Sequence, residues 1–141
     1  MSAYAKREKF YSGFDMEESC IYVDNKKIQD SRYSNIICKI DAIIDRLRDN
    51  PGCGVVSDVY DLFKTMTQHL IKENTFINML DFPFARQHFE NHSEIYSTVA
   101  DLCFKCIIKQ MVDPAELDNV RSIWVKHICH HDRLLEKYLL S

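Results

Sequence analysis

The stretch DPAELDNVRSIWVKHICHHDRLLEKY, residues 113–138, decides the fold class. It opens with an acid at the N-cap (Asp113), a proline in the first turn (Pro114) and a reciprocal glutamate (Glu116), a combination typical of a helix start. Apolar residues then recur in steps of three and four, which return to one helix face. The pattern therefore predicts an amphipathic helix. The apolar positions on its buried face are Leu117, Val120, Trp124, Leu134 and Tyr138.

Three further segments with the same periodicity precede this helix, at about residues 30–49, 55–80 and 83–111. The chain has only three glycines and three prolines, which argues against an all-β sandwich with many tight turns. Short loops make consecutive helices antiparallel. We therefore predict an all-α fold, an up-down-up-down antiparallel four-helix bundle over residues 30–141. Residues 1–29 are mixed and aromatic, and we expect an N-terminal arm packed across the bundle.

The composition narrows the classes of partner. The net charge is -3, without a basic patch, so nucleic acid is not an expected partner. No run approaches the roughly 18 apolar residues that a membrane span needs, and the first residues lack the apolar region of a secretory signal. The sequence therefore predicts a cytoplasmic protein, whose six cysteines are expected to be reduced thiols.

Six polar residues interrupt or flank the apolar faces of the last three helices. Each would cost roughly 1 to 3 kcal/mol if buried without a partner, and their sum would rival the roughly 5 to 15 kcal/mol that stabilises a domain. Any one histidine is readily explained as a core residue with a polar neighbour. A bound cation explains all six together, and imidazole with carboxylate suits iron, manganese or zinc. The candidate ligands are His69, Glu73, His88, His92, His127 and Asp132.

The number of ligands favours two metal ions. Four histidines and two carboxylates exceed the set of one tetrahedral zinc and suit two metals bridged by carboxylate. Ferritin-like di-iron bundles use Glu-x-x-His pairs, and no glutamate here has a histidine three residues later. The H-E-x-x-H signature of zinc proteases is absent as well.

The three motifs resemble those of the hemerythrin family. The family pattern is H-x-x-x-E, H-x-x-x-H and H-x-x-x-x-D on successive helices, and residues 69–73, 88–92 and 127–132 match it in order. Residues 69–74, HLIKEN, look like the family's H-F-x-x-E-E, and residues 81–83 stand where bacterial members place an aromatic-proline turn. The resemblance covers about residues 22–140.

The resemblance implies two non-haem iron ions and a role for each ligand. His88, His92 and His127 would bind one iron and His69 the other. Glu73 and Asp132 would bridge the irons together with a solvent-derived oxo or hydroxo group. The implied function is binding of dioxygen, or of another small diatomic or peroxide ligand, for storage, delivery or sensing. The alternatives are a di-iron redox enzyme acting on peroxide, oxygen, nitric oxide or ferrous iron, and a structural bundle that carries metal only incidentally.

The first helix departs from the family pattern. The family carries D-x-x-H there, whereas this chain has Asp30 followed by Tyr33. A register that uses Asp24 and Lys27 fits less well, because it would place a protonated lysine against a cation. Tyr33 is either a core tyrosine or a phenolate ligand. A phenolate would favour ferric iron and weaken reversible oxygen carriage.

Two smaller features have simpler explanations. Cys103 and Cys106 form a C-x-x-C within a helix, not at a helix N-terminus, where the dipole would activate a thiol. The pair could form a zinc set with His127 and His131, but the 20 intervening residues exceed the usual 12 to 15. His131 could instead support the di-iron ligands or simply pack.

Overall fold

The structure is a computed structural model that describes the backbone of residues 31–141 and the side chains of residues 35–141. Residues 31–141 form five α-helices and one π-helical turn and contain no strand. The prediction of an all-α fold is confirmed, whereas the expected arm over residues 1–29 lies outside the described residues. The elements are α3 Ser31–Asp49, α4 Val56–Asn78, α5 Ala85–Lys109, α6 Pro114–His127, the π-helix η1 Ile128–Asp132 and α7 Arg133–Leu140.

The helix ends follow from local chemistry. The side chain of Asp113 accepts a hydrogen bond from the backbone N–H of Ala115 at 2.9 Å, and Pro114 occupies the first turn of α6. Helix α5 begins at Ala85, two residues after the expected Pro83. It ends at Lys109, and the C-cap residue Gln110 adopts a left-handed conformation with φ of 57° and donates its backbone N–H to the carbonyl of Cys106.

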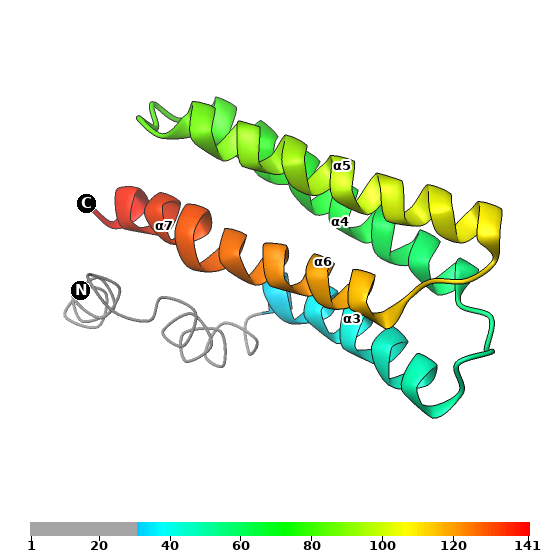
Figure 1. Ribbon diagram of the computed structural model, residues 1–141. Coiled ribbons are helices and arrows are strands. Elements are labelled where there is room, and N and C mark those ends of the chain that lie inside the picture. The colour runs from blue at the N-terminus through cyan, green and yellow to red at the C-terminus, as the bar shows by residue number, and fades with distance from the viewer. Residues whose placement is uncertain (1–30) are drawn as a thin grey trace.

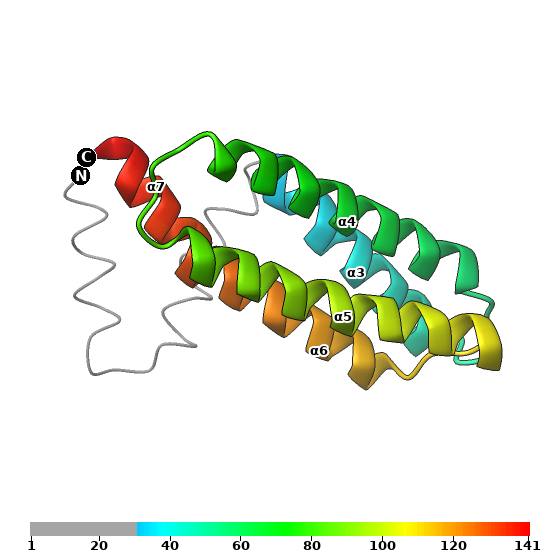
Figure 2. The same ribbon diagram turned by 90° about the horizontal axis from the view of Figure 1, so that it is seen from above.

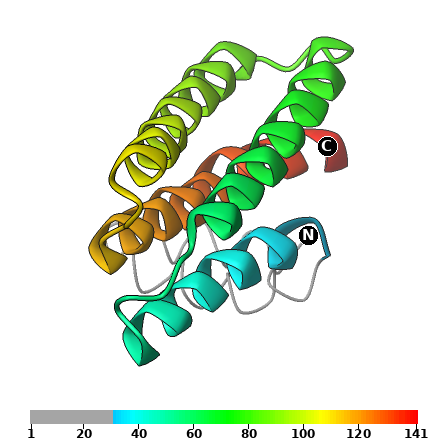
Figure 3. The ribbon, with the colours of Figure 1, turned by 90° about the vertical axis from the view of Figure 1, so that its right-hand side faces the viewer.

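The long helices lie side by side. In Figure 1 the chain runs from left to right along α3 and α5 and from right to left along α4 and α6. Figure 2 shows the same helices from above, with α7 continuing the line of α6. Helix α4 contacts α3 and α5, and α6 contacts the same two helices, so the four surround a common interior, which Figure 3 shows from the right-hand side of Figure 1. None of the described helices has an apolar stretch that could cross a membrane.

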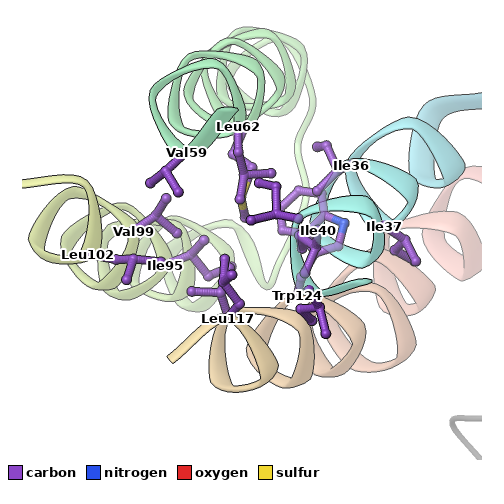
Figure 4. Close-up of a cluster of buried hydrophobic side chains, with 14 of the residues drawn as sticks. Ile36, Ile37, Ile40, Val59, Leu62, Ile95, Val99, Leu102, Leu117 and Trp124 are labelled. Carbon is purple, nitrogen blue, oxygen red and sulfur yellow. The ribbon is translucent and has the colours of Figure 1, made fainter. Parts of the chain in front are cut away.

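The interior is filled by apolar side chains from all four long helices, which point toward one another in Figure 4. Burial of such side chains contributes about 1.5 to 3 kcal/mol each, which holds the helices together. Those buried most completely include Ile40, Val59, Leu62, Leu117 and Trp124. Among the described cysteines, Cys38, Cys53, Cys103 and Cys106 are free thiols.

Two details of the predicted buried faces are wrong. On α4 the regular helical period continues the buried face from Glu73 to Phe76, but Phe76 is 41% exposed, and the next residue, Ile77, is buried in its place. After His127 the buried positions are shifted, because η1 adds one residue to a helical turn. Leu135 is consequently buried where the regular period predicts Leu134.

Candidate metal centre

Three helices and the π-turn supply the six predicted ligands. His69 and Glu73 lie four residues apart on α4, and His88 and His92 lie four apart on α5, so each pair shares a helix face. His127 is the last residue of α6, and Asp132 is the last residue of η1. The structure brings all six side chains into one cluster. The ligands on α4 and α5 lie toward the ends of these two helices that the 79–84 loop joins.

The carboxylate of Glu73 is the centre of this cluster. Its Oε1 lies 2.5 Å from Nε2 of His88, 3.0 Å from Nε2 of His92 and 3.5 Å from Nε2 of His127. Its Oε2 lies on the other side, 3.6 Å from Nε2 of His69. One carboxylate thus faces histidines from all three helices.

Asp132 closes the cluster from the side of η1. Its Oδ1 lies 3.0 Å from Nε2 of His127 and 3.4 Å from Nε2 of His88. The residue is 2% exposed, and its Oδ2 accepts no hydrogen bond from the described residues. Buried carboxylate oxygens of this kind are costly unless a cation or a proton compensates them.

The donor atoms fall into two groups that could each hold a metal ion. Glu73, His88, His92 and His127 form the first, and His69, Glu73 and Asp132 form the second; within each group the donor atoms lie within 4.8 Å of one another. Glu73 belongs to both groups. Cys103 and Cys106 belong to neither, and burial raises the pKa of both thiols, which disfavours the metal-binding thiolate form.

Two asparagines contact the outer nitrogens of the ligands. Nδ1 of His92 donates to the side-chain oxygen of Asn74 at 2.5 Å, and Nδ1 of His127 donates to that of Asn91 at 2.6 Å. Sequence reasoning missed both asparagines. The available signal was their position, because Asn74 follows Glu73 directly and Asn91 directly precedes His92.

The charges of the cluster are strongly coupled. Burial alone would raise the pKa of Glu73, but its close polar contacts with the four surrounding histidines hold it far below its ordinary value. For His127, burial alone would lower the pKa, but the Asp132 carboxylate and the contact with Glu73 raise the pKa to about 9. The pKa of His88 is raised by the same two acids against its burial, while burial keeps the pKa of His92 below its ordinary value.

Aromatic rings form part of the wall around the cluster. Trp124 stacks on His127 at 5.5 Å between ring centroids and meets His69 edge-on at 5.2 Å. His131 stacks on the opposite side at 5.8 Å from His127 and is only partly buried. Phe76, three residues after Glu73 on α4, is exposed and does not contribute to this wall.

Tyr33 lies in the first helical turn of α3, but its side chain lies outside the described residues. The phenolate ligand therefore stays a prediction.

Comparison of the chain with protein-family models, with curated proteins and with solved structures finds no match.

Proposed function

We propose that this chain is a hemerythrin-like protein, an up-down-up-down four-helix bundle that holds a non-haem di-iron centre and binds dioxygen. The proposal rests on one observation above all: the two oxygens of Glu73 face the two groups of donors. A carboxylate that serves two groups is suited to bridge two cations. Iron is proposed as the metal because the order of the three motifs resembles that of the hemerythrin family, which binds iron.

The hydrogen bonds of His92 add a second line of support for a cation. A neutral His92 that donates from Nδ1 to Asn74 has a lone pair on Nε2. That lone pair would face Glu73 Oε1 at 3.0 Å and the ring nitrogen of His127 at 3.2 Å. Once His127 loses its proton, these three groups are all acceptors, and acceptors facing one another are unfavourable in a buried site unless a metal ion lies between them.

In this proposal the protein holds the two irons and keeps water away from them, and no side chain has to react with the bound ligand. Glu73 and Asp132 would hold the two irons, which when bound supply reversible electron transfer to dioxygen. Trp124 and the buried apolar side chains of Met66 and Ile95 would keep bulk water away from the centre. His69 and Glu73 are 19% and 15% exposed, more than the other ligands, so a small ligand would enter from their side of α4.

Metal analysis and optical spectroscopy of the purified protein test the proposal directly. We expect two irons per chain, a spectrum that changes when the diferrous protein is oxygenated, and reversal of that change on degassing. A tyrosinate band that disappears in Tyr33→Phe would identify the phenolate ligand. Turnover of peroxide without reversible oxygenation would support the redox enzyme instead, and a chain that takes up no iron would contradict the proposal.

Metal binding should depend on pH in a defined direction. With a pKa of about 9, His127 is protonated at neutral pH in the metal-free protein, and a metal ion must displace that proton. The affinity for ferrous iron should rise about tenfold per pH unit for this proton between pH 7 and 9, and level off above. Anaerobic chelator competition at several pH values measures this change in affinity.

The stability of the metal-free protein should change in the opposite direction. The folded-state pKa of His127 exceeds its ordinary 6.5, so this residue stabilises the fold fully below pH 6.5. That contribution is lost as the pH rises through about 9.

For the metal-binding prediction, an iron affinity that does not vary between pH 7 and 9 would contradict protonation of His127.

A further inference from the structure

Asn74 and Asn91 form a matched pair of contacts between helices. Asn74 reaches from α4 to His92 on α5, and Asn91 reaches from α5 to His127 on α6. Each asparagine is the chain neighbour of one ligand, either Glu73 or His92, and bonds to a ligand on the next helix. Placement of one ligand is thereby linked to the orientation of another.

We propose that Asn74 and Asn91 are positioning residues that hold His92 and His127 with a proton on Nδ1 and with Nε2 directed at the metals. The inference rests on the proposed di-iron centre. An amide oxygen accepts a hydrogen bond and cannot donate one, so it selects the imidazole form that carries the Nδ1 proton. Nε2, which faces Glu73 in both rings, is then the atom available for a metal.

The second part of the proposal is that the acceptors, the amide oxygens of Asn74 and Asn91, are uncharged. A carboxylate in this position would add negative charge to the centre and make the imidazole a stronger donor. The asparagines orient the rings without that charge, and so favour ferrous iron more than aspartates would. This effect opposes the one expected of a Tyr33 phenolate, which favours ferric iron.

His88 provides an internal comparison. Its Nδ1 is buried and makes no hydrogen bond with any described residue, although its Nε2 lies closest to Glu73. Its ring is held by packing, with Phe82 and His131 edge-on at 6.4 and 5.8 Å. The asparagine contacts therefore distinguish His92 and His127 from the third histidine of the same group.

The test combines two substitutions at Asn74 with two readouts. Asn74→Leu keeps the approximate size and removes the acceptor, and we expect ferrous iron to bind about 10- to 100-fold more weakly in anaerobic chelator competition. In the ¹⁵N-histidine NMR spectrum of the metal-free protein, the Nδ1–H signal of His92 should be lost while that of His127 remains. Asn91→Leu should reverse this pattern.

Asn74→Asp restores an acceptor and should recover both the Nδ1–H signal and tight binding, while it lowers the reduction potential of the iron centre. A purely structural role for Asn74 would not produce that shift. The matched control is Asn119→Leu, at an exposed position of α6, which should leave both readouts unchanged.

Two results would overturn the inference. One is a His92 Nδ1–H signal that survives in Asn74→Leu, and the other is a potential that does not fall in Asn74→Asp. If the wild-type chain takes up no iron, the proposed function fails, but the histidine signals of the metal-free protein still decide whether the asparagines hold the rings.

Discussion

Glu73→Gln should reduce iron binding from two ions per chain to one at most, the largest effect of any single ligand substitution. Glu73 is the only described residue that belongs to both donor groups, so its carboxylate would contact both metals. Glutamine preserves the shape but removes the charge that would bridge two cations. Iron content per chain after anaerobic reconstitution measures the loss.

The same substitution should destabilise the metal-free protein. Removal of one member of a buried ionic cluster leaves its partners uncompensated, which typically costs about 3 to 5 kcal/mol. We expect the lower end of this range, since Asp132 remains beside His88 and His127. The difference from wild type should shrink as the pH falls below about 4.5, because the stabilisation that comes from the depressed pKa of Glu73 is complete only above the ordinary pKa and is lost progressively below it.

Glu94→Gln is the matched control for this experiment. Glu94 lies on α5, is exposed and belongs to neither donor group, so its replacement should change stability by less than about 0.5 kcal/mol and leave iron content unchanged. Two irons bound to Glu73→Gln with wild-type affinity would show that Glu73 is no bridge.

The ligands on α4 and α5 could be predicted from the sequence because their spacing is local. Residues four apart on an α-helix share a face, so His69 with Glu73, and His88 with His92, had to point together. The helix boundaries were equally readable, since Asp113 and Pro114 act through bonds within one turn. The structure places these residues as the periodicity requires.

Asp132 shows where periodicity fails. In a regular α-helix a residue five positions after His127 is rotated by about 140° and points away from its face. The π-helix η1 has hydrogen bonds of longer reach, and its wider turn returns Asp132 to the side of His127. Nothing in the local sequence specifies that wider turn. Bonds of Asn74 and Asn91 to the next helix are likewise set by tertiary packing, which local spacing does not encode.

Trp124→Ala should cause the largest loss of stability among core substitutions, about 3 to 5 kcal/mol. Trp124 is completely buried between the apolar core and the ligand cluster, and its ring touches both His69 and His127. Alanine would leave a cavity beside two ligands and free both rings to move, so iron affinity should fall as well. Because Trp124 is the only tryptophan, unfolding by urea is best followed by circular dichroism.

Trp124→Phe separates packing from polar effects. The indole N–H is buried and makes no hydrogen bond with the described residues, so phenylalanine removes ring volume and no hydrogen bond. We expect a loss of about 1 kcal/mol, with iron affinity close to wild type. Phe104→Ala, at a position 65% exposed on α5, should change stability by less than about 0.5 kcal/mol. If Trp124→Ala were as mild as Phe104→Ala, the ring would not support the ligands, and the orientation of His69 and His127 would have to come from their polar contacts alone.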